Sequence, residues 1–184
     1  PTGAGVIFIS IFTIVELIVL PPTSQSLAVI LLNYLAMLSG WFDDKAINSW
    51  SEYKKGLIDV FLAVAASTLL CDAQTTTIWL PFTKATLSVP PWLFIAGGTI
   101  LIWTAINSTN CTDGVDGLSG TLTAVAFTSL GGLLYFVLGH KEISNYLLLP
   151  HYQDGAVWGI MAFSLVGTIL GYLWYNAHPS RLLP

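Results

Sequence analysis

Long apolar runs are the feature that most constrains how this chain can fold. A helix that crosses a lipid bilayer needs about 20 mainly apolar residues. Only 9% of the residues are charged, whereas a soluble domain carries about 25%. The apolar runs occupy residues 6–20, 26–42, 57–70, 92–106, 118–138 and 156–175.

These runs predict an all-α integral membrane protein, a polytopic bundle of about six transmembrane helices. The first and third runs are short for a full crossing, so we expect their helices to extend into the flanking polar residues. The chain begins at Pro1, not Met, and a short tail follows the last run. We therefore expect a single transmembrane domain over residues 1–184 that is incomplete at both ends.

Six crossings place both ends of the chain on one side of the membrane. Residues 1–5, 43–56, 107–117 and 176–184 then share one face, and residues 21–25, 71–91 and 139–155 share the other. The first face holds four of the six basic residues, namely Lys45, Lys54, Lys55 and Arg181. Because basic residues concentrate in cytoplasmic loops, we expect this face to be cytoplasmic. On the opposite side, β-branched residues around a short polar turn in 72–91 predict a small periplasmic β-hairpin.

The pair Asp43-Asp44 follows the second run without a spacer. It has two interpretations: a helix cap at the membrane interface, or a paired carboxylate that holds a cation or shuttles a proton. Adjacent acids raise one another's pKa unless a metal ion or a basic group compensates. Lys45, Lys54 and Lys55 follow in the same loop and offer that compensation, or bind phosphate themselves.

Residues 107–118 read Asn-Ser-Thr-Asn-Cys-Thr-Asp-Gly-Val-Asp-Gly-Leu and lie between two apolar runs. Ionisable groups at such a place are rare and usually functional, although a plain turn is the simpler interpretation. Glycine lets a backbone approach a ligand closely, because it has no Cβ. Oxygen-rich side chains suit a hard cation such as Mg²⁺, which proteins bind through one or two carboxylates plus substrate phosphates.

The predicted topology brings these polar segments to one membrane face, together with Asn176 and His178 at the end of the sixth run. His178 is either a helix C-terminal cap or a ligand. Several polar segments on one face are typical of a site between the helices of a bundle. The absence of P-loop, Gly-x-Ser-x-Gly and His-Glu-x-x-His motifs removes the usual ATPase, serine hydrolase and zinc protease classes. Glu16 lies inside the first run, and the sequence assigns it no role.

Taken together, these residues resemble the polyprenyl-phosphate N-acetylhexosamine-1-phosphate transferase superfamily, and within it the muramoyl branch. The family motif Asn-x-x-Asn-x-x-Asp-Gly-x-Asp-Gly-Leu is matched in full by residues 107–118. The family's Asp-Asp pair, Lys-Gly-Leu segment and aromatic-Asn-x-x-Pro segment are matched at residues 43–44, 55–57 and 175–179. Pro1-Thr2 resembles the Pro-Thr segment of the muramoyl enzymes.

The resemblance implies a Mg²⁺-dependent phosphoglycosyl transferase of the bacterial inner membrane, with its active site facing the cytoplasm. It implies transfer of phospho-MurNAc-pentapeptide from UDP-MurNAc-pentapeptide to undecaprenyl phosphate, which gives lipid I and UMP in peptidoglycan synthesis. The lipid bilayer surrounds such a protein, no nucleic acid takes part, and a homodimer is compatible with the pattern. About ten transmembrane helices are implied for the intact protein.

By the same resemblance, Asp43 and Asp44 are the expected catalytic carboxylates. Metal-ligand roles are expected for Asp43, Asp44 and Asp113, with the family's own metal-binding Asp falling beyond Pro184. This segment alone is therefore expected to be inactive. The expected substrate-binding residues are Thr2, Lys55, Asn107, Asn110, Asp113, Gly114, Asp116 and Asn176.

Two alternatives remain open at this point. A sibling transferase that uses UDP-GlcNAc shares the same motifs. An ion-coupled membrane transporter would place acidic side chains within its spans, but of the ten acidic residues only Glu16 lies well inside a predicted run.

Overall fold

The structure is a computed structural model, and it describes residues 3–46, 50–71, 76–80, 85–112 and 114–176. The first two helices are α1 (Ala4–Val19) and α2 (Ser24–Lys45). Helix α1 ends before Pro21 and Pro22, because a residue that precedes proline is disfavoured in the helical conformation. A capping box starts α2: the Ser26 N–H donates to the Thr23 hydroxyl, and the Thr23 N–H donates to the Ser26 hydroxyl, both at 3.1 Å. Each bond satisfies a backbone donor that a helix start leaves unpaired.

Helix α3 (Glu52–Leu70) is followed by strands β1 (Thr77–Trp79) and β2 (Thr86–Ser88) and by helix α4 (Pro91–Thr112). The strands pair antiparallel, with Thr77 opposite Ser88. The predicted hairpin between the third and fourth apolar runs is therefore confirmed. Pro91 is the first residue of α4, where proline's missing N–H costs nothing.

The second half of the described chain contains α5 (Leu118–Gly132), a π-helical segment η1 (Leu133–Leu138), the short α6 (Lys141–Tyr146) and α7 (Gly155–Asn176). The wider π-helical turn lies where the backbone of η1 meets α7. A Cβ built on Gly159 would come within 2.7 Å of the Tyr135 Cβ, so only glycine permits this approach. Small residues at such contacts are typical of packed transmembrane helices.

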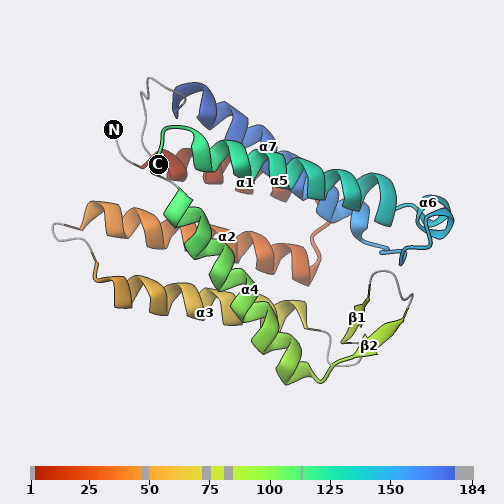
Figure 1. Cartoon of the computed structure of the whole chain (residues 1–184). Helices are drawn as coiled ribbons and strands as arrows, with labels where there is room; N and C mark the ends of the chain where they lie inside the picture. The colour runs from red at the N-terminus through yellow and green to blue at the C-terminus, as the bar shows by residue number, and fades with distance from the viewer. Residues whose placement is uncertain (1–2, 47–49, 72–75, 81–84, 113, 177–184) are drawn as a thin grey trace.

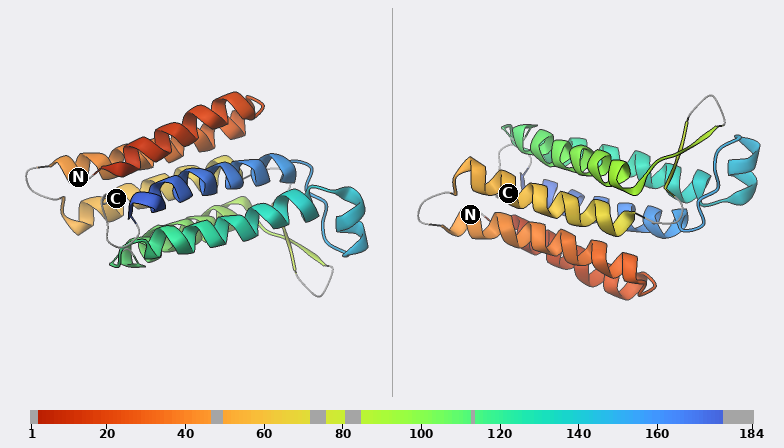
Figure 2. Two further views of the ribbon diagram at one scale, coloured as in Figure 1. Left: turned by 90° about the horizontal axis from the view of Figure 1, so that it is seen from above. Right: turned by 90° about the horizontal axis from the view of Figure 1, so that it is seen from below.

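The long helices run side by side, and α4 crosses them diagonally (Figure 1). The densest helix contacts are those of α5 with α7 and of α3 with α4, while α1 packs against both α2 and α7. The hairpin and α6 lie at one end of the bundle (Figure 2). The opposite end carries the start of α1, the α2–α3 connection, the α4–α5 connection and the end of α7 (Figure 1).

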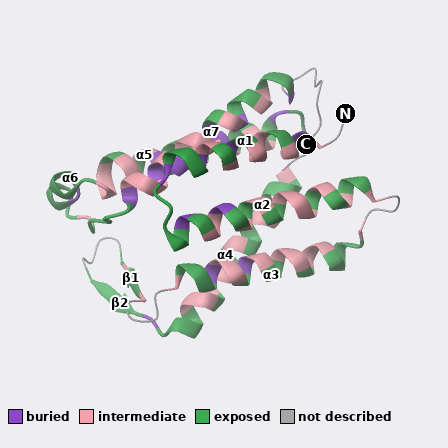
Figure 3. Cartoon of the chain, turned by 180° about the vertical axis from the view of Figure 1, so that it is seen from behind, coloured by how far each residue is buried: buried purple, intermediate pink, exposed green. Residues whose placement is uncertain are grey.

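Few residues of the long helices are buried, and most of their surface is exposed or half-buried (Figure 3). Many of the exposed side chains are large and apolar. One small core cluster contains Phe12, Leu20, Ile30 and Met161. In contrast, Ile18 is 78% exposed on the protein itself. Large apolar side chains so exposed are expected where the surrounding solvent is the hydrocarbon of a bilayer.

In the part of the chain that the structure describes, four segments are long and apolar enough to cross a membrane: Ser24–Lys45, Pro91–Thr112, Leu118–Leu138 and Gly155–Asn176. Helix α1 is apolar but has only 16 residues. Helix α3 is longer than its predicted run because it begins at Glu52, within the preceding polar segment. All six predicted runs are thus helical, and the prediction of a polytopic helical membrane protein is confirmed.

Candidate active site

Asp43 lies in the last turn of α2, beyond the apolar part of that helix, and is held from two directions. The Lys55 Nζ lies 2.9 Å from its Oδ2, and the Trp50 N–H donates to its Oδ1 at 2.7 Å. The hydrogen bond from Lys55, followed by that from Trp50, holds the pKa of Asp43 below its usual range. The same contact raises the pKa of Lys55. Asp43 is therefore an ionised carboxylate with both oxygens engaged.

Asp44 differs from its neighbour in each of these respects. It is exposed, and among the described residues it makes no ion pair. Partial desolvation, followed by the adjacent charge of Asp43, raises its pKa. Asp44 also lines a small cleft of about 200 Å³ between the start of α1 and the end of α2, together with Gly3, Gly40 and Trp41. This carboxyl is thus open to a ligand on the face where the sequence predicts substrate.

Two further lysines of this region stack on tryptophan rings. The Lys45 Nζ lies 4.1 Å from the centre of the Trp41 ring, and the Lys54 Nζ lies 3.5 Å from that of Trp50. A ring face attracts a cation through its negative electrostatic potential. The α2–α3 connection therefore presents positive charge beside the acidic pair.

The end of α4 carries the first residues of the 107–118 motif. The Asn107 side chain donates to the Trp103 carbonyl one turn earlier at 2.8 Å, so it is turned back onto its own helix. Asn110 is exposed in the last turn of α4, and Gly114 and Asp116 are exposed in the turn that follows. These three residues lie at the surface, accessible to a ligand.

A long-range hydrogen bond joins this turn to the end of α7. The Gly117 N–H donates to the Asn176 Oδ1 at 2.9 Å, and the two residues are 59 apart in sequence. Asn176 is 4% exposed, and Gly117 is also buried. Gly117 has φ +74° and begins α5, a left-handed conformation that favours glycine. Asn176 therefore fixes the turn that carries Gly114 and Asp116.

The predicted site residues thus form two groups at the same end of the bundle (Figure 1). One group lies on α2 and α3 and contains Asp43, Asp44 and Lys55. The other lies at the end of α4, in the α4–α5 turn and at the end of α7, and contains Asn107, Asn110, Gly114, Asp116 and Asn176. Thr2 and Asp113 lie outside the described residues.

Sequence reasoning missed two residues that shape these groups. Trp50 contributes a backbone N–H, which no side-chain pattern reveals. Gly117 was part of the recognised motif, but its role as the donor to Asn176 depends on tertiary contact. The repeated Asp-Gly pairs were the available signal, because such pairs favour tight turns.

The predicted Mg²⁺ site depends on carboxylate oxygens at the end of the bundle that carries the motif residues. Among the residues that the structure describes, no three His, Cys, Asp or Glu side chains are close enough to hold a metal ion. Asp43 is already engaged by Lys55 and Trp50. The exposed carboxyls of Asp44 and Asp116 have the hard-oxygen chemistry that Mg²⁺ prefers.

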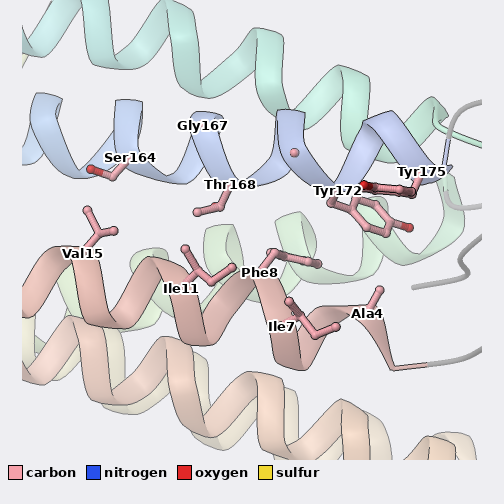
Figure 4. Close-up of a pocket in the computed structure, with 11 residues that line it drawn as sticks. Ala4, Ile7, Phe8, Ile11, Val15, Ser164, Gly167, Thr168, Tyr172 and Tyr175 are labelled. Atoms are coloured by element: carbon pink, nitrogen blue, oxygen red, sulfur yellow. The ribbon is translucent and has the colours of Figure 1, made fainter.

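An apolar groove of about 590 Å³ runs between α1 and α7 and reaches the same end of the bundle (Figure 4). Phe8 and Ile11 line it from α1, and Gly167, Gly171 and Tyr172 line it from α7. The Phe8 and Tyr172 ring centres are 5.2 Å apart. The two glycines are exposed, and a Cβ on either would meet no atom within 4 Å. This face of α7 is therefore open, unlike the face that packs against α5 and η1.

Comparison with known proteins identifies the family that this sequence resembles. The profile of glycosyl transferase family 4 matches residues 26–184. The chain is 44% identical, over its whole length, to a phospho-N-acetylmuramoyl-pentapeptide-transferase of Treponema pallidum (strain Nichols), of which it covers 51%.

More distant relatives carry the same name. The chain is 36% identical to a protein of Gemmatimonas aurantiaca over 68% of the chain and 33% of that protein. It is 30% identical to one of Aquifex aeolicus over 99% of the chain and 52% of that protein. The chain spans about half the length of the relatives that match it throughout. Because the family profile covers most of its residues, this chain belongs to glycosyl transferase family 4.

Proposed function

We propose that the intact protein transfers phospho-MurNAc-pentapeptide from UDP-MurNAc-pentapeptide to undecaprenyl phosphate, and that it does so at the cytoplasmic face of the bacterial inner membrane. The observation that carries the proposal is the 44% identity, over the whole chain, to a protein named phospho-N-acetylmuramoyl-pentapeptide-transferase. The relatives' shared name favours this substrate over UDP-GlcNAc. The gathering of the motif residues at one end of the bundle supports a single site.

The reaction forms one bond and breaks one. An oxygen of the lipid phosphate attacks the phosphorus next to the sugar, the pyrophosphate bond breaks, and UMP leaves with the electron pair. Such a transfer depends mainly on alignment and on neutralising charge. The lipid phosphate must therefore meet the nucleotide at the membrane surface while its polyprenyl tail stays among the apolar helix faces.

The lysines and carboxylates of the α2–α3 connection suit this task. Lys55, held by Asp43 at 2.9 Å, places positive charge where a phosphate would arrive. Asp44, which makes no ion pair among the described residues and has a raised pKa, is the better placed of the two acids to accept a proton. A phosphate monoester has a second pKa of about 6, so positioning contributes more than proton removal near neutral pH.

The α4–α5 turn forms the other wall of the proposed site. Asn110, Gly114 and Asp116 are exposed there and would contact the uridine diphosphate. The Asn107 side chain would join them once it leaves the Trp103 carbonyl and turns away from α4. Asn176 acts through its hydrogen bond to Gly117, as the residue that positions this turn. Thr2 and Asp113 complete the proposed set.

The donor chemistry fits a Mg²⁺ ion, which would be held by the carboxylates of Asp43, Asp44 and Asp113. Bound Mg²⁺ supplies charge neutralisation for the pyrophosphate and the departing UMP. Because Asp43 is already held by Lys55 and by the Trp50 N–H, a metal ion would share its carboxylate with these two partners.

UMP release by the full-length enzyme, with and without Mg²⁺, tests the proposal. Loss of a positioned acid–base or charge-stabilising group costs about 10²- to 10⁴-fold in rate. We expect a loss in this range for Asp43→Asn, for Asp44→Asn and for Asp116→Asn. Asp154→Asn, at an exposed site on the opposite side, serves as the matched control and should retain the normal rate. If both Asp43→Asn and Asp116→Asn kept near-normal rates, the site assignment would be wrong.

A further inference from the structure

Glu16 is a completely buried acid that the proposed reaction does not use. It lies in α1, three residues from the end of that helix, and is 0% exposed. Neither of its carboxyl oxygens has a hydrogen-bond partner among the described residues. A buried polar group without a partner is costly, and the observation therefore requires a chemical explanation.

No positive charge compensates Glu16 among the described residues of the two helices, α2 and α7, that pack against α1. The charged residues of α2 are confined to its last turn, at positions 43–45. Ile30 lines the same small cavity as Glu16, and 13 residues of helix separate it from Asp43, a distance of about 20 Å. Helix α7 contains no acidic, basic or histidine residue, and the other titratable side chains of both helices are tyrosines.

Two hydroxyl groups lie close to the Glu16 carboxyl. The Ser164 hydroxyl faces it from α7, across the α1–α7 contact. The Thr13 hydroxyl lies one turn earlier on α1, since residues three apart share a helix face, and it too is buried without a partner among the described residues. Ser164 stands at the end of the α1–α7 groove, opposite Val15 (Figure 4). Both hydroxyls can accept a hydrogen bond as readily as they donate one, while most of the cavity beside Glu16 is lined by apolar residues such as Leu20 and Ile30.

We propose that Glu16 binds a proton at neutral pH and, as the neutral acid, donates a hydrogen bond across the α1–α7 interface to Ser164. An ionised carboxylate only accepts hydrogen bonds and would need donors or a cation. Taking an unpaired carboxylate out of water costs more than a hydroxyl hydrogen bond returns. The protonated acid avoids that cost and donates a hydrogen bond that the Ser164 oxygen can accept.

This proton site holds together two helices that both reach the active-site end of the bundle. Helix α7 carries Asn176, whose side-chain Oδ1 accepts the hydrogen bond that fixes the α4–α5 turn. The Glu16–Ser164 contact is far from that end, so its effect on transfer is indirect. The proposal concerns the protonation state of Glu16 and stands apart from the identity of the sugar nucleotide.

Infrared spectroscopy of the full-length protein in lipid nanodiscs tests the protonation state directly. The infrared difference spectrum between wild type and Glu16→Gln at pH 7 should contain the carbonyl band of a protonated carboxyl group. This band should shift in D₂O. Ser164→Ala should shift this band, because the acid loses its hydrogen-bond acceptor. Glu142→Gln, at an exposed residue of α6, is the matched control and should give only carboxylate bands. A carboxylate band in the Glu16 difference spectrum would overturn the proposal.

Thermal unfolding provides a second test, because a neutral Glu16 and an ionised Glu16 predict different changes in the melting temperature of the same variants. If Glu16 is neutral, Glu16→Gln replaces one uncharged donor by another and leaves the melting temperature nearly unchanged. Glu16→Leu then lowers it, because the interhelical hydrogen bond is lost. If Glu16 is an unpaired carboxylate, removing its buried charge raises the melting temperature in both variants. That second result would refute the proposal even where the infrared band is weak.

Discussion

The hydrogen bond between Asn176 and Gly117 allows a local prediction of measurable size. In Asn176→Ala, the buried Gly117 N–H loses its acceptor. Leaving a buried donor unpaired costs about 1–3 kcal/mol. At about 1.4 kcal/mol per factor of ten, the amide should exchange with solvent about 5- to 140-fold faster.

Hydrogen exchange measured by mass spectrometry on peptides that contain Gly117 gives the required readout. Asn176→Asp retains an accepting oxygen at the same position and should keep most of the protection. Asn145→Ala, at an exposed site of α6, controls for general loosening of the protein. If Asn176→Ala abolished transfer but left exchange at Gly117 unchanged, Asn176 would act on substrate and not through the turn. That result would refute the positioning role.

Two further predictions concern packing and charge. Gly159→Ala should destabilise the protein by about 1–3 kcal/mol, because the new methyl group overlaps Tyr135, whereas Gly167→Ala, at an open position, should be nearly neutral in thermal melts. Lys55→Met should cost about 0.2–1 kcal/mol at pH 7, as expected for a pair that remains partly exposed to solvent. Because this pair lowers the pKa of Asp43, its stabilisation is present above the ordinary carboxyl pKa of about 3.9 and is lost as the pH falls through the lower folded value. The difference in unfolding free energy between wild type and Lys55→Met should therefore shrink below about pH 4, and a constant difference would contradict the assigned pair.

The helical bundle could be predicted because bilayer thickness sets a local length requirement on each crossing. Six apolar runs with polar breaks came close enough to this length to indicate the helices, although the first and third were short, and the turn residues within 72–91 were enough to indicate the hairpin. The π-helical segment η1 could not be predicted. It depends on the close approach of Gly159 to Tyr135, and no local pattern encodes a contact between separate helices.

The common position of the candidate residues at one end of the bundle could be predicted from the sequence, whereas their contacts could not. Span counting placed Asp43, the 107–118 motif and Asn176 on one face, and the structure has them at one end of the bundle. The sequence did not distinguish Asp43 from Asp44, because the Lys55 and Trp50 contacts arise only when α3 folds back beside α2. Nor did it indicate that Glu16, in an apolar run, is wholly enclosed.

Product analysis with two sugar nucleotides tests the central claim most directly. The full-length protein, purified in detergent with undecaprenyl phosphate and Mg²⁺, is given either UDP-MurNAc-pentapeptide or UDP-GlcNAc. The account predicts a lipid-linked MurNAc-pentapeptide and an equal amount of UMP from the first nucleotide, and no lipid-linked product from the second. A lipid-linked GlcNAc product would contradict the assigned substrate, and cation flux without UMP release from either nucleotide would contradict the transferase itself.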